Sequence, residues 1–84
     1  MQLEQGCVVR SIAGRDADRF YVVLRLEEGA AWIADGKLRP LERPKKKNVK
    51  HLRPTNARAR MEDLATNNQL KRFLKGFGPD KAAT

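Results

Sequence analysis

The side chains of this chain that are most able to do chemistry are basic, and most of them lie in one block. Residues 37–60 contain ten lysines and arginines against a single acid, Glu42, whereas residues 1–36 carry a net charge of −2 and residues 61–84 a net charge of +1. A block of one sign creates a local potential that attracts polyanions. The candidate contacts are Lys37, Arg39, Arg43, Lys45, Lys46, Lys47, Lys50, His51, Arg53, Arg58 and Arg60. Nucleic acid is therefore the expected partner.

Two kinds of basic side chain occur in this block. The lysine run 45–47 is expected in a loop, where ammonium groups follow a phosphate backbone as point charges. Arg39, Arg43 and Arg53 are expected on or beside strands, where a planar guanidinium binds phosphate with two hydrogen bonds or stacks on an unpaired base. A solvated loop is the alternative for the lysine run, but the basic excess over 24 residues favours a polyanion site.

Other side chains have structural alternatives to RNA contact. Arg58 and Arg60 extend the block at the start of an expected helix, and His51 is either an RNA contact or a residue with a local hydrogen bond. Trp32 and Tyr21 are able to stack on bases, but we expect Trp32 in the core and Tyr21 in half-exposed packing. The prediction of RNA binding therefore rests on the block of basic residues.

The sequence favours no catalytic chemistry. Cys7 is the only cysteine, so the chain forms neither an internal disulfide nor a cysteine-based zinc site, and we expect this residue as a small buried hydrophobe. The acidic pairs Asp16 with Asp18 and Glu27 with Glu28 are expected in or beside turns and not in a catalytic site, because paired catalytic carboxylates need a pocket that separates their pKa values. We expect a non-enzymatic protein with no cofactor, no metal and no small-molecule substrate.

The elements that must position the basic block are predicted to be strands. The alternation from Phe20 to Leu26 predicts a strand with one buried face. Asp35-Gly36 is typical of a tight hairpin turn, and the strand that follows this turn contains Pro40, which favours an edge position in the sheet. The expected strands are Cys7–Ile12, Phe20–Leu26, Ala30–Ala34, Leu38–Arg43 and Lys50–Arg53. Five short strands in about 50 residues favour a small barrel over a sandwich.

The chain after Pro54 is predicted to be helical. Residues 57–65 are rich in helix formers. A second helix is expected after an N-cap at Thr66, with Gln69 completing a capping box and Gly76 ending the helix. Its apolar stripe consists of Leu70, Phe73 and Leu74. The expected organisation is a sheet domain over 1–54 with a basic loop at 44–50, a helical extension over 55–77 and a disordered tail over 78–84.

The stretch GCVVRSIAGRDADRFYVV resembles a KOW motif, in which two apolar strands flank a glycine-containing turn. The matching positions are Gly6, Val8, Val9, Gly14, Arg15, Asp16, Arg19, Val22 and Val23. With the run IADGKLRPLERPKKKNVKHL, residues 1–55 resemble the small bacterial KOW-domain RNA-binding proteins, which are similar to KOW-type large-subunit ribosomal proteins. Asp18 stands where many relatives have a second turn glycine, and aspartate tolerates such a conformation.

This resemblance implies a mainly β fold, with a five-stranded SH3-like (KOW) barrel followed by one or two α-helices. It implies binding of ribosomal or structured RNA through the basic loop and a strand face, with the ribosome or ribosomal proteins as further partners, and it adds Arg15 to the candidate contacts. The N-terminus has neither a basic n-region nor a long apolar run, so we expect a cytoplasmic protein without a membrane partner.

One alternative function remains open at this stage. A KOW adaptor would bind another protein in transcription or ribosome assembly complexes, through Leu70, Phe73 and Phe77 of the helical extension together with the barrel face on which it docks. A reader of methylated lysine would need an aromatic cage, which Phe20 and Tyr21, on opposite faces of one strand, do not form.

Overall fold

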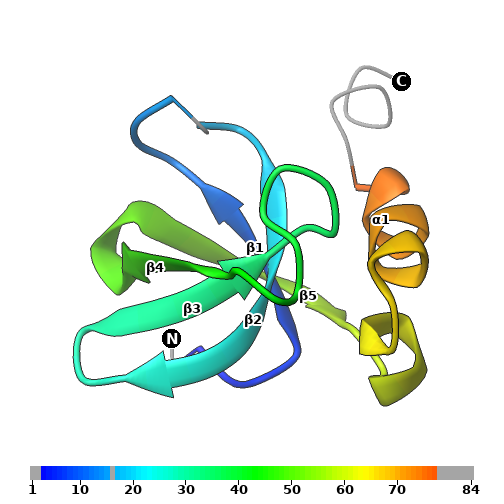
Figure 1. The fold of residues 1–84 in the computed structure, drawn as a ribbon. Helices are drawn as coiled ribbons and strands as arrows, with labels where there is room; N and C mark the ends of the chain where they lie inside the picture. The colour runs from blue at the N-terminus through cyan, green and yellow to red at the C-terminus, as the bar shows by residue number, and fades with distance from the viewer. Residues whose placement is uncertain (1–2, 16, 78–84) are drawn as a thin grey trace.

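The computed structural model describes residues 3–15 and 17–77 of the chain. Its elements, in chain order, are β1 (Cys7–Ser11), β2 (Phe20–Glu27), β3 (Ala30–Ala34), β4 (Lys45–Asn48), the 3-10 helix η1 (Val49–His51), β5 (Leu52–Arg58), the 3-10 helix η2 (Met61–Leu64) and α1 (Asn67–Lys75) (Figure 1). The strands form one antiparallel sheet in the order β4-β3-β2-β1-β5. The prediction of a mainly β fold with a C-terminal helix is confirmed. Within the described residues β4 and β5 do not pair, so the sheet is open and no closed barrel is found.

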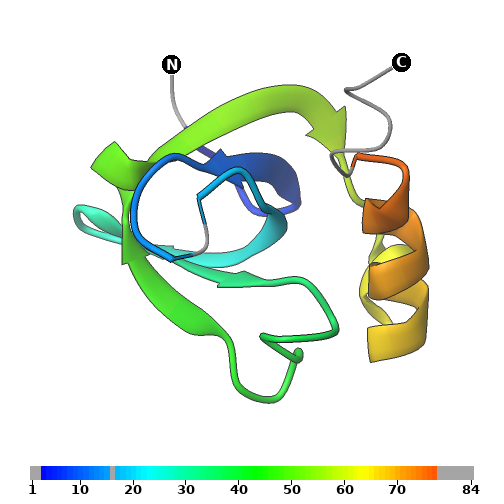
Figure 2. The same cartoon turned by 90° about the horizontal axis from the view of Figure 1, so that it is seen from above.

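Both faces of the central strands are buried. The sheet curls over one face, where the buried side chains are Cys7, Val9, Tyr21, Val23, Ala31, Ile33 and Leu52 (Figure 2). Helix α1 covers the other face, where Val8, Val22 and Ala34 pack against Leu70 and Leu74. The prediction that β2 buries only one face is therefore wrong, because Tyr21 and Val22 point to opposite faces and both are buried. Burial of apolar surface on both sides is the main force that holds this small fold together.

The first two connections of the sheet contain residues in the left-handed region of backbone conformation. The turn between β1 and β2 has Gly14 at a φ of +83°, and Asp18 takes a φ of +69°, in the left-handed region that favours glycine. The amide of Asp18 donates to the carbonyl of Ser11 at 2.7 Å, which closes this turn. Asp16 lies outside the described residues. Between β2 and β3, the residue at positive φ is Gly29, at +74°.

The strand predicted over residues 38–43 is not formed. Of Asp35 and Gly36 only Gly36 has a positive φ, +78°, so the two-residue hairpin turn does not arise. Instead, Oδ1 of Asp35 accepts hydrogen bonds from the backbone amides of Lys37 at 2.9 Å and Arg39 at 2.8 Å. These bonds start a loop over residues 35–44 that leads to β4.

The prediction of a basic loop over residues 44–50 is also wrong, because this segment contains β4 and η1. Strand β4 pairs with β3 at an edge of the sheet, and this pairing satisfies the backbone groups that face β3 without an apolar sequence. Strand β5 extends from Leu52 to Arg58, past the expected domain boundary at residue 54. It pairs with β1 alone, which is the edge position where a sheet tolerates Pro54.

The helical prediction is confirmed for its second half only. Residues 57–65 contain the end of β5 and the short η2, whose Met61 is 89% exposed. Thr66 is the N-cap of α1, and its hydroxyl accepts from the backbone amide of Gln69 at 3.1 Å. Gly76 is the C-cap with a right-handed φ of −69°, and not a left-handed residue. The tail predicted over residues 78–84 lies outside the described residues.

Across the described part of the chain, the structure contains no helix long and apolar enough to cross a membrane.

Candidate nucleic-acid interface

The lysine run does not form one solvated surface. Lys47 is only 8% exposed, and its Nζ donates to the carbonyl oxygen of Ala13 at 2.9 Å. Lys45 shares this face of the strand, opposite Ile33, and is half-buried. Lys46 points to the other face. The expectation that all three ammonium groups follow a phosphate backbone is therefore corrected, because strand alternation sends neighbouring side chains to opposite faces.

Lys46 belongs to a cluster around Trp32 on the outer face of the sheet. The indole N–H of Trp32 donates to Oε1 of Glu27 at 2.9 Å, and Oε2 of the same carboxylate pairs with Nζ of Lys46 at 3.2 Å. The guanidinium of Arg25 lies 5.0 Å from the centre of the indole ring. The hydrogen bond from Trp32, followed by that from Lys46, lowers the pKa of Glu27 below its usual value.

The expected positions of the two large aromatic residues are therefore reversed. Tyr21 is 1% exposed and lies in the cluster enclosed by the sheet, whereas Trp32 is half-buried on the outer face under two cationic side chains. Cys7 is buried, as predicted.

Other members of the basic block are paired with acids. Arg58, at the end of β5, forms an ion pair with Glu4. Arg60 pairs with Glu62, with a distance of 3.4 Å between Nη1 and Oε1. Exposed pairs of this kind contribute little to stability, but each reduces the positive potential that its arginine presents.

The remaining candidates are exposed and form no ion pair with a described acid. They are Arg15, Lys37, Arg39, Arg43, Lys50, His51 and Arg53. Three of them lie in the 35–44 loop, and three lie in or beside η1, which is on the side of the molecule opposite α1 (Figure 1). Arg53 also lies directly across from Arg10 in the β1–β5 ladder. The structure therefore divides the block between these two exposed regions.

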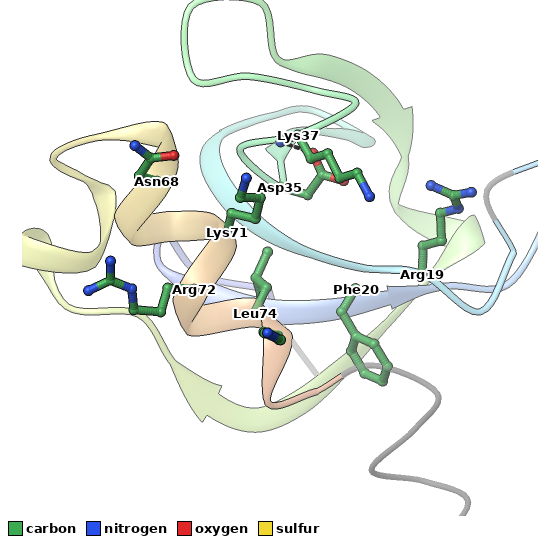
Figure 3. A pocket seen from close by; sticks show the side chains of 9 residues that line it. Arg19, Phe20, Asp35, Lys37, Asn68, Lys71, Arg72 and Leu74 are labelled. Carbon is green, nitrogen blue, oxygen red and sulfur yellow. Dashed lines mark hydrogen bonds between the residues drawn. The ribbon is translucent and has the colours of Figure 1, made fainter.

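A groove between α1, the start of β2 and the 35–44 loop adds basic residues that were not predicted. It has a volume of about 760 Å³ (Figure 3). Its lining consists of Arg19, Phe20, Asp35, Lys37, Asn68, Lys71, Arg72, Leu74 and Lys75. Only Lys37 is among the predicted contacts. The signal in the sequence is the spacing of Lys71 and Lys75 beside the apolar Leu70 and Leu74, which places them at the border of the docked face of the helix.

The wall of this groove is held by a close contact between the loop and the helix. A Cβ atom built on Gly36 would lie 2.4 Å from the backbone oxygen of Asn67, so only glycine fits at this approach. The Asn67 side chain accepts from the amide of Leu41 at 2.7 Å and donates to Oε1 of Glu42 at 2.6 Å. The first residue of α1 is thereby tied to both halves of the 35–44 loop.

No protein-family model matches this chain, and a comparison with curated protein sequences also finds no match. The assignment to the KOW proteins therefore stays a prediction from the motif residues.

The chemistry available at these surfaces is the binding of anions. Within residues 3–15 and 17–77, histidine, cysteine and acidic side chains do not gather in groups of three or more that could hold a metal ion. A second, smaller hollow of about 260 Å³ lies on the other side of Arg72, beside Glu62 and Asp63. These acids make it a poor site for phosphate.

Proposed function

We propose that this chain is a non-enzymatic RNA-binding protein of the translation apparatus, and that it binds ribosomal or structured RNA. The observation that carries the proposal is the set of exposed basic residues without acidic partners in the described structure: Arg15, Lys37, Arg39, Arg43, Lys50, His51 and Arg53. Phosphate contacts by such side chains release counterions, which supplies most of the sequence-independent affinity for nucleic acid.

The type of fold gives further support. The proposed class is the SH3-like KOW domain, and a curled five-stranded antiparallel sheet agrees with that class. Asp18 stands at the place of the second turn glycine in the KOW motif, and its positive φ is one that glycine adopts without strain. Lysines and arginines held in loops and a 3-10 helix beside the sheet favour recognition of backbone and shape over base sequence.

The test is the salt dependence of RNA affinity for matched charge variants. Arg39→Gln with Arg43→Gln removes two unpaired cations from the loop, whereas Arg25→Gln with Arg58→Gln removes two that are paired with glutamates. Each lost phosphate contact reduces the magnitude of the slope of log K against log salt by about 0.7–0.9. The slope of the loop variant should therefore be smaller than that of the wild type by about 1.4–1.8. The control should retain nearly the full slope in the same titration of a labelled RNA hairpin.

Association with the ribosome has its own measurement. We expect the protein in a cell lysate to sediment with large subunits at low salt and to be released at high salt. A protein that binds no RNA even in dilute buffer would contradict the proposal.

The adaptor alternative receives no support from its predicted interface. Leu70 is fully buried against the sheet, and Phe77 packs on Phe73 and Phe20 with ring centres 5.4 and 6.0 Å away. Leu70 is therefore not accessible to a partner, and Phe73 and Phe77 are half-buried in contacts within the chain.

A further inference from the structure

We propose that the groove between α1 and the sheet binds a single-stranded segment of RNA through its phosphates. The inference rests on the proposed function and deepens it, because it assigns the strandedness of the RNA and adds a contact surface. The added residues are Arg19, Lys71, Arg72 and Lys75, which line the groove together with Lys37.

The groove carries an excess of positive charge. Five cationic side chains line it, and none of them forms an ion pair with a described acid. Asp35 is the one carboxylate among the described residues of the lining, and its Oδ1 already accepts hydrogen bonds from two backbone amides of the loop. A concave surface lined by one sign of charge focuses the potential and raises the local concentration of anions.

Folding brings these charges together against their mutual repulsion. Lys71 and Lys75 are four residues apart on α1, where like charges disfavour the helix. Docking of α1 then places Lys71 beside the loop that carries Lys37, and in Figure 3 Lys71 extends from the helix and Lys37 from the loop that faces it. A bound phosphate would relieve this repulsion, so the arrangement favours an anionic ligand over an empty groove.

The rest of the lining favours one strand over a duplex. Phe20 adds the part of its apolar surface that its packing on Phe77 leaves exposed, and the exposed amide of Asn68 is able to donate to or accept from a base edge. A basic groove with an aromatic side chain is typical of proteins that bind single strands. The volume of about 760 Å³ lies in the range of about 300–1,000 Å³ found for sites that hold single small ligands. An unpaired nucleotide is able to place its base in such a space, whereas the bases of a duplex are held inside the helix by pairing and stacking.

The experiment compares affinities for a labelled oligouridine of about eight nucleotides, a length within the range of known single-strand sites. The groove variant carries Lys71→Gln with Lys75→Gln, and the charge-matched control carries Arg25→Gln with Arg58→Gln. Loss of one counterion-releasing contact weakens binding roughly 5-fold at 0.1 M salt, so the groove variant should bind about 25-fold more weakly than the wild type. The control should change less than about 3-fold. Thermal unfolding of each variant verifies that α1 remains docked.

A second readout locates the RNA directly. In amide NMR spectra of the full chain, we expect the oligouridine to shift the signals of Arg19, Gly36 and Lys71 together, and a duplex of the same length to shift them less. If the wild type binds RNA while these signals stay fixed and the groove variant equals the control, the groove proposal is wrong and the proposed function stands. If free phosphate or a duplex moves the groove signals as strongly as the oligouridine, the single-strand assignment is wrong. Absence of binding to every RNA overturns the proposed function as well.

Discussion

The Nζ of Lys47 donates to the carbonyl oxygen of Ala13 at 2.9 Å, and this bond joins the first half of the sheet to β4. The same carbonyl accepts from the hydroxyl of Ser11 at 3.2 Å, and both donor residues are buried. A lysine in a basic run thus has a structural role, whereas its neighbour Lys46 lies on the exposed face.

This difference predicts unequal stabilities for two variants with the same change in charge. Lys47→Gln should lower the free energy of unfolding by about 1–3 kcal/mol, because it leaves a part-buried carbonyl without its charged donor. Lys46→Gln removes an exposed ion pair and should cost less than about 1 kcal/mol. Urea unfolding of both variants measures the difference, and equal losses would contradict the role assigned to Lys47.

Gly36 and Gly29 provide a matched pair for the docking of α1. Both have positive φ, +78° and +74°, so an alanine at either position costs about 1–2 kcal/mol of backbone strain. At Gly29 an added Cβ meets no described atom within 4 Å, whereas at Gly36 it meets the backbone oxygen of Asn67 at 2.4 Å. Gly36→Ala should therefore destabilise the protein clearly more than Gly29→Ala in thermal unfolding. It should also shift the amide NMR signals of α1, and an unchanged α1 would refute the close contact.

The carboxylate of Glu27 predicts a pH effect that depends on Trp32. Its pKa is lowered first by the hydrogen bond from the indole N–H and then by that from Lys46. Since the pKa is lower in the folded state, the stabilisation is present above the unfolded-state pKa and is lost as the pH falls through the folded-state pKa. Trp32→Phe should raise the pKa of Glu27 in an NMR titration of the side-chain carboxyl, whereas Glu28, for which no such bond exists in the described structure, serves as the reference.

The N-cap at Thr66 should contribute measurably to the stability of α1. Thr66→Ala removes the hydroxyl that accepts from the amide of Gln69 and should cost about 0.5–2 kcal/mol of unfolding free energy. Thr66→Ser keeps the hydroxyl and should lie close to the wild type. If the alanine and serine variants unfold at the same temperature, the cap contributes nothing to the docked helix.

The first three strands and α1 were predictable because their signals are local. Runs such as FYVVLRL combine β-branched residues with alternation, and Thr66 and Gln69 mark a helix start by chemistry within one turn. What the sequence could not show was that both faces of β2 are covered, because the cover comes from β5 and from a helix more than forty residues away. The reversed positions of Tyr21 and Trp32 follow from this.

The second half was harder to predict because pairing overrides propensity there. Strand β4 consists of three lysines and an asparagine, and β5 contains a proline and two arginines. Neither has an apolar alternation, and both form because β3 and β1 offer free backbone groups at the two edges of the sheet. The basic groove was missed for a related reason: its cations come from three distant segments and become neighbours only after α1 docks.

Asp18 has a consequence for how such a protein can vary. Its backbone takes a conformation that glycine adopts without strain, and its carboxylate lies 3.6 Å from the guanidinium of Arg10. Exchange of aspartate for glycine here would preserve the shape of the turn while unmasking one arginine. A single substitution at this position would thus change the attraction for polyanions by one charge without changing the fold.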